Sequence, residues 1–376
     1  MAPPPRKILM TADSVGGVWN YALQLASELD KRDVEVTLVV LGGKPSPDQA
    51  MEASSVKNLS LIGTDFRLEW MDEPEPDLRL AGELLLELEA EQRPDVVHLN
   101  GYSHAALPFA APVLVVAHSC VPSWWRACRG TPLPPEWSAY RERVAVGVAA
   151  ADMVVAPTAA FLHEFVGLHG QPRASRTILN GREPGAFTAG SKRPMALAAG
   201  RLWDEAKNIG TLCRAAEGLA WPVLVAGEST SPDGVTAELP RNVHCVGRVG
   251  SPEIAARMAE AAVFVSPARY EPFGLAILEA ALSGCALVLG DIPTLRELWD
   301  KAALFVPPDD PDALRSALAS LLSDPAEAAA LGARARRRAG RYTASRKAEA
   351  YLDAYASLVA GQAPGVAAAE PLRASA

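Results

Sequence analysis

The sequence lacks the segments that would direct this chain into a membrane or a secretory route. No run of 18 apolar, uncharged residues occurs in it, whereas a helix needs about 20 such residues to cross a bilayer. Only a few apolar residues lie between the N-terminal MAPPPRK and Asp13, fewer than a signal peptide requires. We therefore predict a cytoplasmic protein without a transmembrane segment.

The chain is also poor in cysteine. Its five cysteines are odd in number, and none forms a CxxC or CxxH pair; they are Cys120, Cys128, Cys213, Cys245 and Cys285. Such usage is typical of a reducing compartment and gives no zinc-binding spacing. We expect neither a disulfide framework nor a structural metal.

Net charge argues against nucleic acid as a partner. The chain has 376 residues and a formal charge of -8, of which -7 falls in residues 1–187 and -1 in residues 188–376. An acidic first half disfavours contact with a polyanion or an anionic lipid surface. The length, with 49% apolar and 21% charged residues, predicts an ordinary globular protein of two domains.

Short apolar runs alternate with amphipathic stretches along most of the chain. KILMTA, VEVTLVVL, DVVHLN, PVLVVAH and DMVVAPT read as strands separated by helices, and the pattern restarts at MALAAGRL with residues 195–202. Strands that are apolar on both faces indicate parallel sheets covered by helices on both sides. The fold class predicted is α/β, with two Rossmann-like, doubly wound parallel-sheet domains facing a central cleft.

The composition of two segments predicts a linker and a disordered tail. Residues 180–194 are rich in glycine, proline and polar residues, which favours a linker. We predict domains at 1–187 and 188–342, a last helix at about 343–360 that packs back on the first domain, and a disordered tail at 361–376 that lacks patterned apolar residues.

Four loops that follow predicted strands carry candidate binding residues, because ligands of parallel sheets bind at the carboxyl ends of strands. Gly16 and Gly17 could bring backbone amides to an anion or simply form a tight turn. His118 could bind a polar ligand or act in proton transfer, with Trp124 and Trp125 near it to stack on a sugar; the alternative is a packed histidine in a loop anchored by aromatics. His98 fits a buried core position better.

Arg201 and Lys207 flank the next strand-to-helix turn. Two cations spaced in this way can converge on a diphosphate, to which arginine offers a fork of donors and lysine a compact charge. The alternative is a pair neutralised by Asp204 and Glu205. Neither GxGxxG nor GxxxxGK[ST] occurs in the chain, which removes the main support for dinucleotide and P-loop readings.

The stretch RYEPFGLAILEA places two glutamates around a predicted helix start. Glu271 precedes the Pro-Phe-Gly break, and Glu279 falls in the second turn of a helix that begins at Gly274 or Leu275. Amides at such a start can bind a phosphate or a sugar hydroxyl. The two carboxylates could accept hydrogen bonds from hydroxyls on either side, an arrangement suited to a nucleotide sugar.

These elements, taken in order, resemble the GT4-type family of retaining glycosyltransferases with the GT-B fold. The resemblance rests on EPFGLAILEA, on Gly200-Arg201 followed by Lys207-Asn208, on Asn180-Gly181, on Gly16-Gly17 and on His118 at a strand end. It extends to about residue 360. It implies a hexosyltransferase that takes a nucleotide sugar, with a UDP-sugar favoured and a GDP-sugar next, and a small-molecule, glycan or lipid-linked acceptor.

The resemblance also implies residue roles. Arg201 and Lys207 would bind the diphosphate, Glu271 the sugar hydroxyls and Glu279 the ribose, while His118 would lie near the transferred sugar. Three loops would make further contacts with the donor. Gly16 and Gly17 would close over the phosphates, and the amides of Phe273, Gly274 and Leu275 would touch the sugar and the phosphate. The base would be contacted by Gly247, Arg248 and Val249. Trp124, Trp125 and Asn180 are candidates on the acceptor side.

The implied mechanism needs no metal ion and no cofactor. Two cations and a helix start can stabilise the departing diphosphate, and no DxD precedes the donor segment. Retention of configuration at the anomeric carbon would come from attack of the acceptor on the face that the diphosphate leaves, because no carboxylate is evidently placed to form a covalent intermediate. A GT-B-fold epimerase of nucleotide sugars and a non-catalytic nucleotide-sugar-binding protein are the alternatives.

Two segments depart from the family pattern. The usual Pro-Asn-Gly is Leu179-Asn180-Gly181 here, and the segment after Gly290 reads DIPTLREL in place of a glycine-rich turn. The sugar pocket near Asp291, Pro293 and Thr294 could therefore differ, and the sequence leaves the acceptor open.

Overall fold

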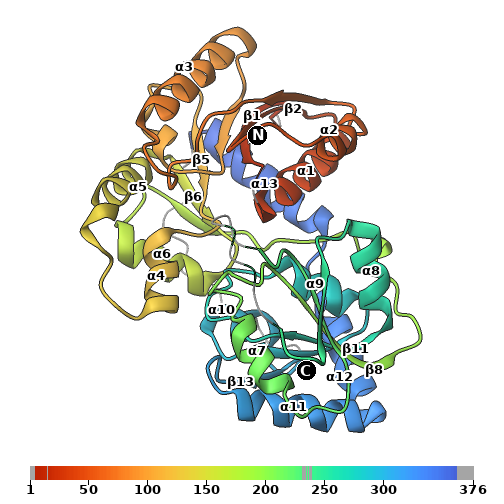
Figure 1. Ribbon diagram of the computed structural model, residues 1–376. Helices are drawn as coiled ribbons and strands as arrows, with labels where there is room; N and C mark the ends of the chain where they lie inside the picture. The colour runs from red at the N-terminus through yellow and green to blue at the C-terminus, as the bar shows by residue number, and fades with distance from the viewer. Residues whose placement is uncertain (1–4, 15, 231–233, 235, 237–238, 362–376) are drawn as a thin grey trace. The chain divides into compact units, whose positions relative to one another are not determined.

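A computed structural model describes residues 5–14, 16–230, 234, 236 and 239–361 (Figure 1). The chain divides into two compact units. The first unit comprises the residues up to 125, residues 131–180 and the residues from 344 on, and the second comprises residues 126–130 and 181–343. Residues 362–376 of the predicted tail lie outside the described residues.

The first unit contains a parallel sheet with the order β3-β2-β1-β4-β5-β6-β7 in the part of the chain that the structure describes. Its strands are β1 (Lys7–Asp13), β2 (Glu35–Leu41), β3 (Leu59–Gly63), β4 (Val96–Leu99), β5 (Val113–Val116), β6 (Met153–Ala156) and β7 (Ser175–Thr177). Its helices are α1 (Gly17–Asp30), α2 (Pro47–Ser54), α3 (Glu75–Gln92), α5 (Ser138–Ala150), α6 (Ala159–His169) and α13 (Ala344–Val359), with the 3-10 turns η1 (Ser103–Ala106) and η2 (Pro135–Trp137). Helix α4 (Val121–Arg129) begins in this unit.

The second unit contains a parallel sheet with the order β10-β9-β8-β11-β12-β13 among the described residues. Its strands are β8 (Arg193–Ala199), β9 (Val223–Ala226), β10 (Val243–Gly247), β11 (Ala261–Ser266), β12 (Ala286–Gly290) and β13 (Leu304–Val306). Its helices are α7 (Ile209–Ala216), α8 (Ser251–Glu260), α9 (Leu275–Leu282), α10 (Pro293–Trp299), α11 (Pro311–Ser323) and α12 (Pro325–Ala339), with η3 (Pro184–Ala186) before β8. The predicted pair of doubly wound α/β sheets is confirmed.

Continuous apolar strands arise because both faces of each sheet are covered. In β1, Ile8, Met10 and Ala12 join a core formed with α1, α2 and α13. Leu9, which points to the opposite face, is only 1% exposed. Alternate residues of a strand face opposite sides, so a strand buried on both sides needs apolar residues at every position.

The chain leaves the first unit earlier than the boundary predicted after residue 187. The backbone N–H of Arg182 donates to the carbonyl of Tyr342 at 3.0 Å, and Arg182 and Thr343 form an isolated parallel bridge. These contacts hold the segment from Gly181 on in the second unit.

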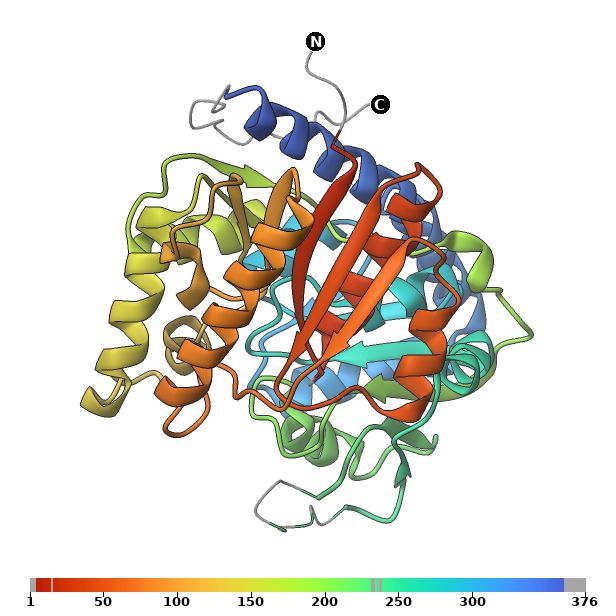
Figure 2. The same ribbon diagram turned by 90° about the horizontal axis from the view of Figure 1, so that it is seen from above.

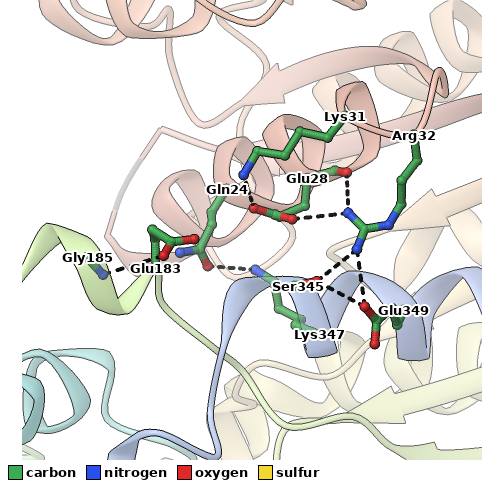
Figure 3. Close-up of polar contacts among 9 residues, drawn as sticks. All are labelled: Gln24, Glu28, Lys31, Arg32, Glu183, Gly185, Ser345, Lys347 and Glu349. Atoms are coloured by element: carbon green, nitrogen blue, oxygen red, sulfur yellow. Dashed lines mark hydrogen bonds and ion pairs between the residues drawn. The ribbon is translucent and has the colours of Figure 1, made fainter.

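Helix α13 belongs to the first unit and packs along α1 (Figure 2). The ammonium of Lys347, whose residue is 2% exposed, donates to the carbonyl of Tyr21 and to Oε1 of Gln24 at 3.2 and 3.0 Å. Arg32 donates to Ser345 and Glu349 (Figure 3). An apolar stripe flanked by these polar contacts fixes the last helix on the first unit.

Two helical glycines provide a matched test of packing in the first unit. A Cβ at Gly147 in α5 would lie 2.0 Å from the carbonyl oxygen of Tyr102, whereas a Cβ at Gly167 in α6 would meet nothing within 4 Å. We expect Gly147→Ala to lower the free energy of unfolding by about 2 kcal/mol or more. Gly167→Ala should raise it by up to about 1 kcal/mol, because alanine favours the helix. Urea unfolding of both variants checks this, and equal effects would contradict the close approach at Gly147.

Candidate active site

The candidate site of the second unit lies at the carboxyl ends of β8 and β11. The strand order reverses between these two neighbours, and at such a point the loops diverge and leave room for a ligand. The loop after β8 carries Arg201 and Lys207, and the loop after β11 carries Glu271. Two segments far apart in the sequence thus supply one group of charged side chains.

Lys207 and Glu271 form an ion pair with 2.6 Å between Nζ and Oε2. Their side chains are 27% and 15% exposed. Burial disfavours the ammonium ion, but the adjoining carboxylate outweighs it and holds the pKa of Lys207 above its ordinary value. Lys207 therefore stays charged, and an ammonium has three N–H donors, so it can hold Glu271 and still donate to a ligand.

Arg201 is anchored by Asp204 rather than neutralised in a buried pair. Its Nη2 donates to Oδ2 of Asp204 at 2.8 Å, while the side chain remains 42% exposed. Its guanidinium also lies 4.8 Å from the centre of the Trp203 ring. The alternative in which Asp204 and Glu205 neutralise both cations is therefore not what the structure shows. Asp204 contacts Arg201, but Lys207 pairs with Glu271 and Glu205 pairs with Arg129.

Asn208 joins three loops at this edge of the sheet. It has a left-handed backbone with φ of 54° at the start of α7. Its side-chain amide donates to the carbonyls of Pro267 and Pro308 at 3.0 and 2.6 Å, and its Oδ1 accepts from Thr211. A buried amide with its hydrogen bonds made fixes the loops after β8, β11 and β13 against one another.

The start of α9 depends on glycine. Gly274 has φ of 84°, and a Cβ there would lie 2.7 Å from Ile277 and 3.2 Å from Cγ of Glu271. Leu275 is the first helical residue, as predicted. Phe273 is buried with its ring 6.0 Å from that of Tyr342, so only its backbone could reach a ligand.

Helix α10 supports the same loop. The hydroxyl of Thr294, one residue after Pro293, donates to the carbonyl of Glu271 at 2.7 Å. Asp291 instead receives two hydrogen bonds from Arg296, at 2.6 and 2.7 Å, and these lower the pKa of its carboxyl group. The segment that departs from the family pattern therefore supports the backbone of Glu271 through Thr294. The acid of this segment, Asp291, is held in an ion pair with Arg296.

Glu279 has a partner that the sequence analysis did not identify. Nε and Nη2 of Arg182 lie 2.6 and 2.5 Å from its Oε1. Arg182 directly follows Asn180-Gly181, which the resemblance had singled out, but nothing in a linear sequence joins positions 97 residues apart. Both predicted carboxylates of this unit are thus paired with a cation.

The predicted base-binding loop follows β10. Gly247 is the last residue of that strand, with φ of 72°, and its carbonyl accepts from the N–H of Gly227 at 2.9 Å. Arg248 is exposed and lies 3.6 Å from Glu228, and Val249 is half-buried. These three residues line the same edge of the sheet as Arg201.

In the first unit, Gly16 and Gly17 stand at the start of α1. Both are exposed, and a Cβ on either would meet nothing within 4 Å. Gly16 has φ of 98°, which favours glycine. Helix α1 has no acidic residue in its first turn, so its amides face no carboxylate of their own helix.

His118 follows β5 and is held in one tautomer. Its Nε2 lies 2.7 Å from Oδ1 of Asn100, whose amide nitrogen donates to the carbonyl of Thr11 at 2.6 Å. Because that oxygen only accepts, Nε2 carries the proton and Nδ1 is an acceptor. Burial, together with the charge of Lys347, lowers the pKa of His118 to about 3, so the ring is neutral at physiological pH and acts as a hydrogen-bonding group.

The acceptor-side candidates lie in different segments of the first unit. Trp124 and Trp125 are half-buried neighbours on α4 with ring centres 6.4 Å apart, and Nε1 of Trp125 donates to Thr131 at 3.0 Å. Asn180 is 6% exposed. The structure thus places His118 and the tryptophans after β5 and Asn180 after β7.

The described residues contain no cluster of three or more histidine, cysteine, aspartate or glutamate side chains that could hold a metal ion. None of the helices in the described part of the chain is long and apolar enough to span a bilayer.

Comparison with known families gives matches over both units. Residues 15–185 match the model described as Glycosyltransferase Family 4, and residues 193–324 match that described as Glycosyl transferases group 1. Glycogen synthase of Mycobacterium tuberculosis is 28% identical over 271 residues, which are 65% of this chain and 64% of that protein. D-rhamnosyltransferase WbpZ of Pseudomonas aeruginosa is 31% identical over 141 residues, 35% and 37% of the two chains. The matched parts span less than two thirds of these relatives.

Solved structures share the fold over nearly the whole chain. Sucrose-phosphate synthase from Thermosynechococcus elongatus matches with a TM-score of 0.77 and 22% identity over 95% of this chain and 100% of that one. Anabaena Alr3699/HepE in complex with UDP-glucose matches with a TM-score of 0.72 and 16% identity over 93% and 99%.

Burial of neutral histidine should make stability depend on pH. His98 is fully buried, as predicted, between the hydroxyls of Tyr21 and Tyr355, and burial lowers its pKa to about 3. An unfolded histidine titrates near about 6.5. Only the unfolded chain therefore takes up this proton as the pH falls from 6.5 towards 3, and stability present above 6.5 is lost in that window.

We expect wild type to lose about 2 kcal/mol more of its free energy of unfolding between pH 7 and pH 5 than His98→Asn does. Urea unfolding at the two pH values measures this difference. Equal losses in the two proteins would show that His98 is protonated in the folded state.

Proposed function

This chain belongs to the GT4-type family of GT-B glycosyltransferases, and on that premise we propose that it transfers a hexose from a nucleotide sugar to an acceptor hydroxyl. A UDP-sugar is the favoured donor and a GDP-sugar the next. The UDP preference is supported by a structural neighbour solved with UDP-glucose. The acceptor is a small molecule, a glycan or a lipid-linked sugar.

The observation that carries the proposal is the grouping of Arg201, Lys207 and Glu271 beside the start of α9. The two cations are 42% and 27% exposed, so their N–H groups can reach a bound diphosphate. Glu271 sits beside Lys207 and offers oxygens to sugar hydroxyls. The amides of Phe273, Gly274 and Leu275 lie at a helix start, where backbone donors face an anion.

The rest of the donor would extend along the same sheet edge. Glu279 is proposed to accept from the ribose, and Gly247, Arg248 and Val249 to face the base. In the first unit, Gly16 and Gly17 are proposed to bind the phosphates through their backbone amides. His118 is proposed to contact the transferred sugar. The neutral His118, with Nδ1 as an acceptor, suits a hydrogen bond from a sugar hydroxyl better than proton transfer.

The proposed chemistry uses cations in place of a metal. The bond from the anomeric carbon to the phosphate oxygen breaks with its electron pair on phosphate, and Arg201 and Lys207 stabilise that charge. The acceptor oxygen bonds to the same face of the anomeric carbon and passes its proton to the departing phosphate oxygen. We propose no covalent intermediate, because Glu271 and Glu279 are assigned to the sugar and ribose hydroxyls and both oxygens of Asp291 accept from Arg296.

Release of nucleoside diphosphate from a panel of UDP-, GDP- and ADP-sugars tests the function. We expect slow hydrolysis of one donor by wild type, and a loss of about 100-fold or more in kcat for Lys207→Ala, because the departing charge loses a donor. Arg257→Ala, which removes a half-buried cation of α8 paired with the exposed Glu253, should keep the wild-type rate.

Circular dichroism and thermal unfolding of each variant separate loss of chemistry from loss of fold. Nucleotide-sugar binding without any release would favour a non-catalytic binding protein. Interconversion of the bound sugar would favour an epimerase.

Metal dependence and the anomer of the released sugar test the proposed mechanism. Excess EDTA should leave the rate within error, because side chains stabilise the leaving group. The sugar first released should have the anomeric configuration of the donor when followed by proton NMR. A requirement for Mn²⁺ or Mg²⁺, or release of the opposite anomer, would contradict the corresponding part.

A further inference from the structure

Arg182 and Glu279 form the most enclosed of the ion pairs described at the donor edge. Their side chains are 15% and 13% exposed. Nε and Nη2 of Arg182 lie 2.6 and 2.5 Å from the same oxygen, Oε1. Within the described residues no donor contacts Oε2, so half of the carboxylate is held and half remains open to a ligand.

The backbone of Arg182 is itself fixed. Its N–H donates to the carbonyl of Tyr342 at 3.0 Å. Tyr342 is 3% exposed, donates through its hydroxyl to the carbonyl of Leu298 at 2.9 Å, and packs edge-on against Phe273 and Trp299. The guanidinium is therefore presented from a rigid point that also contacts the loop before α9.

We propose that Arg182 is a positioning and specificity-determining residue for the nucleotide, which aims Oε2 of Glu279 at the ribose hydroxyls. This inference rests on the proposed function. A glutamate on a helix loses rotamer freedom when it binds a ligand, and a partner that fixes it beforehand removes that loss at the moment of binding. The arginine also cancels a negative charge that would otherwise repel the diphosphate at close range.

The carboxylate of Glu279 is anchored through Oε1 alone. Arg182 can therefore fix this carboxylate and balance its charge without occupying Oε2, the oxygen that a ribose hydroxyl needs. A lysine could supply the charge but not the two-nitrogen fork. Substitution of Arg182 by lysine or glutamine can therefore separate the orientation of the Glu279 carboxylate from the neutralisation of its charge.

The test is isothermal titration of UDP and 2′-deoxy-UDP, with GDP and 2′-deoxy-GDP run in parallel, into wild type, Arg182→Lys and Arg182→Gln. Wild type should bind the ribonucleotide about tenfold more tightly than the deoxy form, because a hydrogen bond to a charged group is lost. The ratio should fall to about two- to threefold in Arg182→Gln, since Glu279 is no longer aimed. The ratio for Arg182→Lys should lie between these two values. In a separate kinetic assay, Arg182→Lys should raise KM for the donor by a larger factor than it lowers kcat.

Arg269→Gln is the matched control. It breaks another ion pair of the same unit, 2.6 Å to Asp309, but leaves Glu279 untouched, so the hydroxyl ratio should stay at the wild-type value. Retention of the wild-type ratio in either Arg182 variant overturns the inference while leaving the proposed function intact. Failure of wild type to bind any of the four nucleotides overturns both.

Arg182→Lys keeps the test decisive if Arg182→Gln does not fold, because a lysine leaves the buried carboxylate with a cation. A merely structural role for Arg182 would weaken all four nucleotides by the same factor and leave the ratio unchanged. That outcome, too, overturns the inference.

Discussion

The ion pair between Lys207 and Glu271 is the contact on which the second unit's site depends. It joins the loop after β8 to the loop after β11 at 2.6 Å, across the point where the strand order reverses. Asn208, in the loop after β8, donates to carbonyls of the loops after β11 and β13, and Thr294 on α10 donates to the carbonyl of Glu271. The loops after β8, β11 and β13 and helix α10 thus brace the site, which is what preorganised electrostatic catalysis requires.

Charge pairing explains how carboxylates can stand where a diphosphate would bind. Two acids at one sheet edge would repel an anionic ligand, but Glu271 and Glu279 each contact a cation. Pairing also offsets the cost of burying them in an apolar helix environment. The acids can then serve as acceptors for hydroxyls, while Arg201 contributes positive charge from a more exposed position.

The first unit uses neutral polar groups instead. His98 and His118 have pKa values lowered to about 3 by burial, and each is oriented by hydrogen bonds. Lys347 reaches this region from α13 and lies 4.5 Å from the centre of the Tyr21 ring. The last helix of the chain therefore shapes the electrostatics around the strand-end histidine of the unit in which the chain began.

From sequence alone we predicted the pair of doubly wound sheets, a start of α9 at Gly274 or Leu275 and the candidate residues after β5, β8 and β11, because apolar periodicity and glycine turns are local signals. The sequence did not reveal short strands such as β3 and β13, which are only partly buried and so lack a continuous apolar run. The partners of the two acids were decided by tertiary structure alone. Lys207 meets Glu271 across 64 positions and Arg182 meets Glu279 across 97, and no local pattern encodes a contact that forms only when separate strands align in one sheet.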